Sequence, residues 1–204
     1  MNVHTVLIGA GGHAKVVYEA MIHAGYAETE VTLRADRTQN FMGRSVVSPE
    51  FPENMHGLHA HVAIGDNSVR ARLLRAAVKR GATLLRVIHP GAKLSPSTTI
   101  ADGSFIACGA ILAASVTVGT GVIVNHGSII DHDCRIDHNT HIAPGAVMGG
   151  GVSIGQNVLL GANATILPGL DIGNDVLIGA GSVVTKSIAS GSSWIGTSCV
   201  PKEN

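Results

Sequence analysis

The stretch GVSIGQNVLLGANATILPGLDIGNDVLIGAGSVV, residues 151–184, carries an aliphatic residue at every sixth position: Ile154, Leu160, Ile166, Ile172, Ile178 and Val184. Toward the N-terminus the same spacing continues without a break through Met148, Ile142, Ile136, Ile130, Val124, Val118, Leu112, Ile106, Ile100, Leu94 and Ile88. Two residues before most of these positions the side chain is small or modest, as at Ser104, Cys134 and Ala164. Repetition at a fixed short period is the sequence signature of a solenoid.

The repeat has a simple physical interpretation. Residues two apart on a strand point to the same face, so each repeat supplies two inward side chains, and four residues remain for a corner. Three corners give a triangular coil of 18 residues that buries its inward side chains against its neighbours. Glycines often follow the aliphatic positions, and we expect them to adopt the positive φ angles that corners need, as at Gly119, Gly155 and Gly161. The sequence predicts an all-β solenoid over residues 88–204, with a C-terminal tail after about residue 185.

Residues 1–87 follow a different pattern. HTVLIGAGGHAKVVYEAMIHAGY, residues 4–26, predicts a strand, a glycine turn and a helix, and Gly9, Gly11 and Ala14 fit the loose fingerprint G-x-G-x-x-G/A. A second apolar run ends at Asp36, and a third, HVAIGDN at 61–67, leads into a helical segment. We expect a βαβαβ Rossmann-like domain whose first helix N-terminus binds phosphate. The glycines also suit a plain tight turn, and a nucleotide attached to another group fits better than NAD.

Composition narrows the classes of function. Lys plus Arg and Asp plus Glu both number 14, so the formal net charge is zero, which argues against a nucleic-acid partner. Cys108, Cys134 and Cys199 are isolated and lack the spacing of zinc ligands. An odd cysteine count without a leader suits a reducing compartment, and no apolar run is long enough to span a membrane. We therefore expect a cytoplasmic protein without a membrane partner.

A second stretch, NHGSIIDHDCRIDHNTHIAPGA at 125–146, concentrates histidines. A metal site needs three or four converging ligands, but His126, His132 and His138 are six apart and fall on three different sides of one coil, so we predict no metal. Proton transfer fits better, because an imidazole beside a carboxylate can act as a base near pH 7, as in the pair His132–Asp133. His132 and His141 lie half a coil apart and face away from each other within one chain, so a site that contained both would need a neighbouring subunit.

These residues carry a family resemblance. A short Rossmann-like unit with G-x-G-G-H at 9–13, an IGDN segment and then the six-residue repeat resembles the NeuD/PglD-like hexapeptide-repeat sugar acyltransferases, which include sialic acid O-acetyltransferases and UDP-amino-sugar N-acetyltransferases. The resemblance covers essentially the whole chain. It implies a left-handed parallel β-helix, acetyl-CoA as co-substrate, a nucleotide-sugar substrate that is a UDP-sugar, and a homotrimer with active sites between neighbouring subunits.

The resemblance also implies roles for individual residues. His132 is expected to be the general base and Asp133 its partner, at the position where the family often has Glu. Contacts to acetyl-CoA are expected from His141, Gly150, Ala162 and Ala180. Contacts to the nucleotide sugar are expected from Gly11, Gly12, His13, Asp36, Gly65, Asp66, Asn67 and Asn125. The C-terminal IGTSCVPKEN departs from the family pattern G-x-P-A-K, where outer CoA contacts would lie.

The sequence thus predicts an N-acetyltransferase acting on a nucleotide-linked 4-amino-4,6-dideoxy sugar. The sugar amine attacks the thioester directly, His132 removes the proton, and a backbone N–H or His141 stabilises the oxyanion. One alternative keeps the transfer but changes the acceptor to a hydroxyl, as in sialic acid O-acetylation. Another is a non-catalytic nucleotide-binding scaffold, which would bind no CoA; the His–Asp pair speaks against it.

Overall fold

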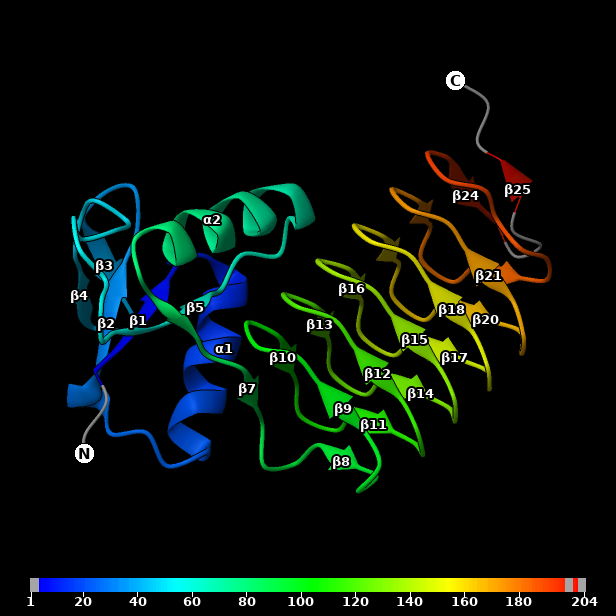
Figure 1. Ribbon diagram of the computed structural model, residues 1–204, viewed down its shortest axis with the longest axis horizontal. Coiled ribbons are helices and arrows are strands. Elements are labelled where there is room, and N and C mark those ends of the chain that lie inside the picture. The colour runs from blue at the N-terminus through cyan, green and yellow to red at the C-terminus, as the bar shows by residue number, and fades with distance from the viewer. Residues whose placement is uncertain (1–3, 197–199, 202–204) are drawn as a thin grey trace.

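The computed structural model describes residues 4–196 and 200–201. Figure 1 shows an α/β unit at the N-terminal end, from which a long solenoid leads away to the C-terminal end. The predicted combination of a Rossmann-like unit and a parallel β-helix is confirmed. The predicted division between residues 87 and 88 falls inside the first solenoid strand, β7 (Val87–Ile88). Cys199 and most of the divergent C-terminal motif lie outside the described residues.

The N-terminal unit is a parallel sheet in the order β2-β1-β5-β6. Its strands are β1 (Thr5–Ile8), β2 (Val31–Arg34), β5 (His59–Val62) and β6 (Thr83–Leu84). Helix α1 (Gly12–His23) connects β1 to β2, and α2 (Asn67–Lys79) connects β5 to β6. All four residues of β1 are buried, because side chains of α1 cover one face of the sheet and side chains of α2 the other.

The sequence patterns did not indicate three short elements, one directly before β2 and two between β2 and β5. These are the 3₁₀ helix η1 (Glu28–Glu30) and a hairpin of β3 (Gln39–Phe41) and β4 (Arg44–Val46). Each strand of the hairpin has only three residues, too few to show an alternating pattern. Within the described residues, no helix is both long and apolar enough to cross a bilayer.

The solenoid consists of three parallel sheets built from two-residue strands. The first sheet contains β7, β10 (Phe105–Ile106), β13 (Ile123–Val124), β16 (His141–Ile142), β19 (Leu159–Leu160) and β22 (Leu177–Ile178), followed by β24 (Ser193–Ile195) and the antiparallel β25 (Val200–Pro201). The second contains β8 (Lys93–Leu94), β11 (Ile111–Leu112), β14 (Ile129–Ile130), β17 (Val147–Met148), β20 (Thr165–Ile166) and β23 (Val183–Val184). The third contains β9 (Thr99–Ile100), β12 (Thr117–Val118), β15 (Arg135–Ile136), β18 (Ser153–Ile154) and β21 (Asp171–Ile172).

The register confirms the predicted coil of 18 residues. Phe105 pairs with Ile123, and Ile123 pairs with His141 in the next coil. The aliphatic positions from Ile106 onward form one buried core, and the small residues two positions earlier are buried with them. Cys134 is one of these inward residues, and its Sγ lies 3.2 Å from the carbonyl oxygen of Gly149. Its predicted place in the core is confirmed.

The glycines that follow the aliphatic positions have a different role from the one predicted. None of the three named above has a positive φ angle: Gly119, Gly155 and Gly161. They are needed because the next coil passes too close for a side chain. A Cβ on Gly161 would lie 2.5 Å from the backbone nitrogen of Ala180. From Gly103 to Gly181 the positive φ angles occur two residues later in the corner, at Gly121 for instance but also at Asp133 and Asn157.

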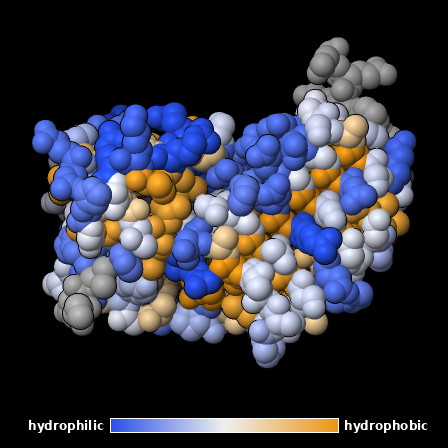
Figure 2. Space-filling view, in the orientation of Figure 1, coloured by the Kyte–Doolittle hydropathy of each residue, from blue (hydrophilic) through white to orange (hydrophobic). Residues whose placement is uncertain are grey.

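The outward residues give the three sheets three different surfaces. On the first sheet Val87, Phe105 and Ile123 are apolar and packed against the N-terminal unit. On the second sheet the outward residues Ile111 and Ile129 are 37% and 41% exposed. On the third sheet the outward residues are mostly polar: Thr99, Thr117, Arg135, Ser153 and Asp171. Figure 2 shows hydrophobic residues as a diagonal band along the stacked coils.

The close approach of successive coils leads to a test. Gly161→Ala would force a methyl group against backbone of the next coil, so we expect a loss of about 1–3 kcal/mol of unfolding free energy and a melting temperature several degrees lower. Gly65→Ala is the matched control, since a Cβ there has open space and the φ angle is not positive. Scanning calorimetry of both variants is the measurement. Equal melting temperatures would contradict the steric role of Gly161.

Candidate functional site

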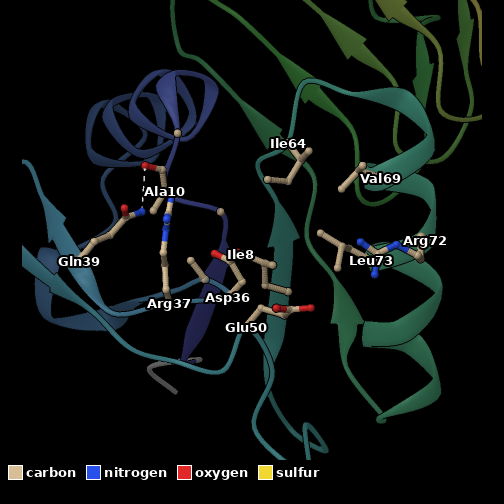
Figure 3. A pocket seen from close by; sticks show the side chains of 13 residues that line it. Ile8, Ala10, Asp36, Arg37, Gln39, Glu50, Ile64, Val69, Arg72 and Leu73 are labelled. Atoms are coloured by element: carbon tan, nitrogen blue, oxygen red, sulfur yellow. Dashed lines mark hydrogen bonds between the residues drawn. The ribbon is translucent and has the colours of Figure 1, made fainter.

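A pocket of about 510 Å³ lies in the N-terminal unit at the carboxyl ends of β1, β2 and β5 (Figure 3). In the sheet order β2-β1-β5, the chain crosses from one side of β1 to the other at this point. Open α/β sheets bind their ligands in such a crevice. Of the residues predicted to contact the nucleotide sugar, Gly11 and Asp36 line this pocket.

The turn after β1 has the geometry of an anion site. Gly9 has a φ angle of +123°, and a Cβ there would lie 2.8 Å from the carbonyl oxygen of Ala63, which directly follows the neighbouring strand β5, so only glycine fits. Gly11 is the N-cap of α1, and no side chain in the described part of the chain caps this helix. The N–H groups of its first turn, which begins at Gly12 and His13, are therefore available to a phosphate.

Four further polar side chains line the pocket, and sequence reasoning missed them: Arg37, Gln39, Glu50 and Arg72. The two arginines bring positive charge from two sides of the pocket, which suits a diphosphate. Gln39 donates from Nε2 to the carbonyl oxygen of Ala10, 3.4 Å away, and so supports the glycine turn (Figure 3). No motif marks these residues in the sequence, although Arg37 directly follows the predicted Asp36.

The structure does not bring Gly65, Asp66 and Asn67 to this pocket; they line a separate hollow beside β19 and β22. The Asp66 carboxylate caps α2 by accepting from the backbone N–H of Val69 at 2.8 Å. Asn67 donates from Nδ2 to the carbonyl oxygen of Val158, 3.0 Å away in the solenoid. These side chains serve helix capping and contact between the two parts of the chain, and their role as substrate contacts stays a prediction.

His132 lies at a corner between the second and third solenoid sheets, with its side chain 60% exposed. Its Nδ1 is 2.8 Å from Oδ2 of Asp133. Because a carboxylate only accepts, Nδ1 carries the proton and Nε2 carries the lone pair of the neutral ring. The hydrogen bond to Asp133, and then the charge of Asp131, raise the pKa of His132. This pair has the geometry of a base held by a carboxylate.

Two features of the corners accommodate this pair. Asp133 occupies the corner position with positive φ, at 59°, which Asp tolerates better than longer side chains do. Gly150 is stacked one coil beyond His132, and a Cβ there would lie 2.5 Å from the ring Nε2. The structure thus places Gly150, predicted as an acetyl-CoA contact, directly against the imidazole.

His141 lies on β16 under the N-terminal unit and is half-buried. Its Nδ1 is 3.3 Å from the carbonyl oxygen of Gly65, and its Nε2 is 3.2 Å from Nδ2 of Asn125. Burial, and then the charge of Arg70, lower the pKa of His141 to about 4. In this arrangement Nδ1–H is already used and Nε2 has no proton, so a backbone N–H is the better oxyanion donor of the two alternatives named above.

His13 lies beside this site, with its ring centroid 6.2 Å from that of His141. Its Nε2 is buried and has no hydrogen-bond partner among the described residues. Burial, together with neighbouring histidines, lowers the pKa of His13 to about 3. The predicted residues Asn125, His13 and His141 are therefore brought together at the junction of the two parts of the chain.

The remaining predicted residues lie on different edges of the solenoid. His132 and Gly150 are at corners between the second and third sheets, whereas Ala162 and Ala180 are at corners between the first and second. Within one chain the structure does not bring these two groups together. Among the described residues no three His, Cys, Asp or Glu side chains are grouped so that they could hold a metal ion.

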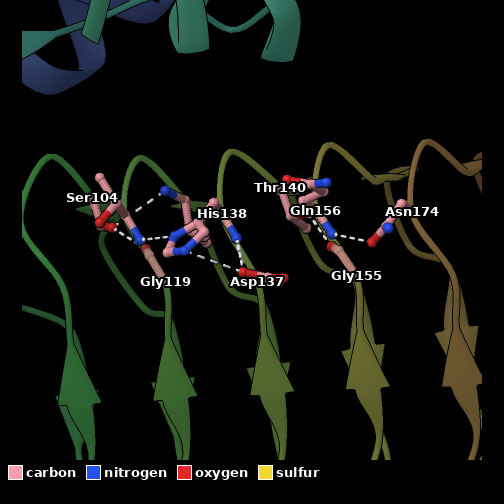
Figure 4. Close-up of polar contacts among 10 residues, drawn as sticks. Ser104, Gly119, Asp137, His138, Thr140, Gly155, Gln156 and Asn174 are labelled. Atoms are coloured by element: carbon pink, nitrogen blue, oxygen red, sulfur yellow. Dashed lines mark hydrogen bonds and ion pairs between the residues drawn. The ribbon is translucent and has the colours of Figure 1, made fainter. Parts of the chain in front are cut away.

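His138, left open by the sequence, has a structural role (Figure 4). Its Nδ1 accepts from the backbone N–H of Thr120 at 2.9 Å, one coil earlier. Asn174 makes the equivalent contact to the backbone N–H of Gln156 at 3.0 Å. A ladder of such bonds therefore holds the corners between the third and first sheets, and His138 is one member of it.

Because several histidines are buried in their neutral form, we expect the free energy of unfolding to decrease in acid. His61 is 1% exposed, and burial lowers its pKa from 6.5 to about 4. The unfolded chain keeps the ordinary value, so as the pH falls the unfolded state binds the proton first. The contribution is complete above about pH 6.5 and is lost toward pH 4, on the order of 3 kcal/mol for His61.

Urea unfolding at a series of pH values from 7.5 to about 4.5 measures this dependence. His61→Leu should flatten it, while lowering stability at neutral pH because the Leu85 carbonyl loses its donor. His4→Gln, at an exposed histidine, is the control and should keep the wild-type slope. A wild-type stability that stays constant down to pH 4.5 would show that these histidines are not held neutral.

Comparison with known proteins agrees with this architecture. The family model described as PglD N-terminal domain matches residues 5–77, and the hexapeptide repeat of succinyl-transferase matches residues 151–186. No curated protein matches the chain. PerB from Caulobacter crescentus, in complex with CoA and GDP-perosamine, is 35% identical with a TM-score of 0.90, over 98% of this chain and 97% of that one.

Two other solved structures are similar over nearly their full length. The acetyltransferase domain of PglB from Neisseria gonorrhoeae FA1090, in complex with acetyl coenzyme A, is 34% identical with a TM-score of 0.90, over 99% of this chain and 100% of that one. WeeI from Acinetobacter baumannii AYE is 24% identical with a TM-score of 0.88, over 97% and 99%, and supports the fold alone. The full-length similarity above 30% identity shows that the chain belongs to the family of sugar acetyltransferases that join a PglD-type N-terminal domain to a hexapeptide-repeat solenoid.

Proposed function

We propose that this protein transfers an acetyl group from acetyl-CoA to the amine of a nucleotide-linked 4-amino-4,6-dideoxy sugar. The observation that carries the proposal is the exposed His132 with its Nδ1 held by Asp133, in a chain that also has a nucleotide-sized pocket. The similar proteins support the choice of substrates, since PerB binds CoA and GDP-perosamine and the PglB domain binds acetyl coenzyme A.

In the proposed reaction the sugar amine attacks the thioester carbonyl carbon directly. Nε2 of His132 takes a proton from the amine as the C–N bond forms, and Asp133 stabilises the resulting imidazolium. A backbone N–H stabilises the oxyanion. The C–S bond then breaks, the CoA thiolate leaves, and the proton returns to it from His132. No acyl-enzyme is required.

The nucleotide is proposed to occupy the pocket at the end of β1. Its phosphates would meet the first turn of α1 together with Arg37 and Arg72, and Asp36 would contact the nucleoside. The family resemblance favours UDP, whereas similarity to a protein that binds GDP-perosamine favours GDP. UDP-linked and GDP-linked sugars should therefore be tested in the same assay.

The experiment that tests the function is a panel assay. The purified protein is incubated with acetyl-CoA and UDP-, dTDP- or GDP-linked 4-amino-4,6-dideoxy sugars, with sialic acid as the hydroxyl acceptor. Release of CoA thiol and the mass of the product are measured. An N-acetylated nucleotide sugar supports the proposal, acetylation of sialic acid alone supports the O-acetyltransferase alternative, and failure to bind CoA by calorimetry supports the scaffold.

A homotrimer is proposed as the active form. The second solenoid sheet presents an apolar outer face at Ile111 and Ile129, and is flanked by the corner of His132 on one side and the corner of Ala162 and Ala180 on the other. Packing this sheet around a threefold axis would bring the His132 corner of one subunit to the opposite corner of its neighbour. The two groups that are apart in one chain would then form one site.

Removal of the base should affect turnover strongly. His132→Ala is expected to lower kcat by about 10²–10⁴, with little change in CoA affinity. Asp133→Asn should lower kcat less and move the acid limb of the kcat/KM profile to lower pH, because Asp133 is the main group that raises the pKa of His132. His138→Asn is the control, since Asn can keep the bond to the Thr120 N–H, as Asn174 does for Gln156. Wild-type turnover of His132→Ala would exclude its role as base.

Subunit mixing tests the shared site. His132→Ala and Ala180→Trp change opposite corners, and each alone should be inactive. After dissociation and reassociation of the two variants in equal amounts, about a quarter of the interfaces would pair an intact His132 with an intact Ala180 corner, so about a quarter of the activity should return. Sedimentation gives the oligomeric state. A fully active monomer, or no recovery in mixed trimers, would overturn the intersubunit site.

A further inference from the structure

The largest fully buried side chain of the described residues is a charged one, Arg70 on α2, which is 1% exposed. Its Nε donates to Gly121 O at 2.7 Å. Its Nη1 donates to Ile64 O at 3.1 Å and Gly65 O at 3.0 Å, and its Nη2 donates at 2.7 Å to both Asn67 Oδ1 and Asn139 O. Among these described acceptors there is no carboxylate.

These contacts join three segments that are distant in the sequence. Loop 64–67 belongs to the N-terminal unit, whereas Gly121 and Asn139 are equivalent corner residues of two successive coils. A buried guanidinium is costly unless its N–H groups are all bonded, and here the planar fork is matched by acceptors from all three segments. An apolar side chain would fill this space with less desolvation, so the arginine points to a geometric function.

The contact network continues from Arg70 to His141. The Gly65 carbonyl accepts from Arg70 Nη1 and also lies 3.3 Å from His141 Nδ1, which must therefore be protonated. On the other side of the ring, Oδ1 of Asn125 accepts from the His126 N–H at 2.9 Å, which turns Nδ2 toward His141 Nε2. Both neighbours require the neutral ring with its lone pair on Nε2.

The charged and titratable groups around His141 also favour its neutral form. His13 from α1 lies with its ring centroid 6.2 Å from that of His141, and Arg70 from α2 places its charge beside the ring. Asp66 at the N-cap of α2 partly offsets the charge of Arg70, while His61 from β5 and His126 from the adjoining corner act on His13. Burial and the cation of Arg70 lower the pKa of His141 to about 4, and His61 and His13 are also lowered. The junction therefore keeps one charge state over the range in which exposed His132 titrates.

We propose that Arg70 is a positioning residue for acetyl transfer: it locks loop 64–67 onto the solenoid and thereby holds His141 at the site as a neutral Nδ1–H tautomer. This proposal rests on the proposed function, because it takes His141 to be a contact to the acetyl-CoA used in that reaction. Arg70 itself touches neither substrate. Its effect on the reaction passes through the Gly65 carbonyl and the corner at Asn139, two residues before His141.

Two variants separate the geometry of Arg70 from its charge. Arg70→Lys keeps the charge but loses the planar fork, and Arg70→Met keeps a long side chain but loses the charge. Arg75→Met is the control, because Arg75 is exposed on the same helix. The full-length proteins are labelled with ¹⁵N-histidine, and the His141 signals are identified with His141→Gln. Tautomer, pH titration, melting temperature and steady-state kinetics are then measured.

The wild type is expected to show His141 as the Nδ1–H tautomer and uncharged at neutral pH. Arg70→Lys should lose the single tautomer and lower kcat/KM by about 10- to 100-fold, the effect of slight misplacement. Arg70→Met should in addition raise the pKa of His141, since the nearby cation is gone. Arg75→Met should match the wild type in all four measurements.

Three results would overturn the proposal: a wild-type His141 that is charged or protonated on Nε2 at pH 7, which needs no variant; an unchanged tautomer in both Arg70 variants; or unchanged kcat/KM in both. Failure of the proposed function looks different. A wild type that acetylates no amino sugar would refute that function, while the tautomer and titration of His141 would still decide whether Arg70 positions it.

Discussion

The strict stacking of 18-residue coils is the constraint on which the rest of the structure depends. Because the coils from β7 to β23 all have the same length, the position of a residue within its coil determines both its sheet and whether it points inward. On the first sheet the outward residues Val87, Phe105 and Ile123 are apolar and packed against the N-terminal unit, whereas the outward residues of the third sheet are mostly polar. The same repeat thus forms the core and also gives the solenoid faces of different polarity, one of which packs against the N-terminal unit.

The fold was predictable because its two signals are local: a six-residue period, and a strand–glycine–helix segment. The pair His132–Asp133 was predictable for the same reason, since adjacent residues at a corner need no tertiary information to meet. The contacts of Arg70 and Asn67 with the solenoid span 51 and 91 residues and follow no pattern in the chain. The steric role of Gly161 was missed because a sequence does not distinguish a glycine that needs a positive φ angle from one that needs empty space beside it.

Loop 64–67 illustrates how the local pattern of a motif leaves its tertiary contacts undetermined. It follows a strand and opens a helix, as a phosphate-binding turn does, yet Asp66 caps α2 with its own carboxylate and so occupies the helix N-terminus. Helix α1 begins with Gly11 and Gly12 instead and has no side-chain cap among the described residues, which leaves its first turn open to an anion. The two similar strand–turn–helix units therefore differ in their contacts: the first turn of α1 has no side-chain cap, whereas loop 64–67 is bonded to its own helix and to the solenoid.

The histidines show how environment divides one residue type into two kinds. His132 stands in solvent beside two carboxylates, and its pKa is raised; His13, His61 and His141 are enclosed beside Arg70, and their pKa values are lowered. Near neutral pH the buried three stay uncharged, so their hydrogen bonds and tautomers persist while His132 gains and loses its proton. Proton transfer at the corner can then proceed without altering the charge of the junction between the two parts of the chain. That separation suits the proposed role of His132 as a base that works beside a site with fixed geometry.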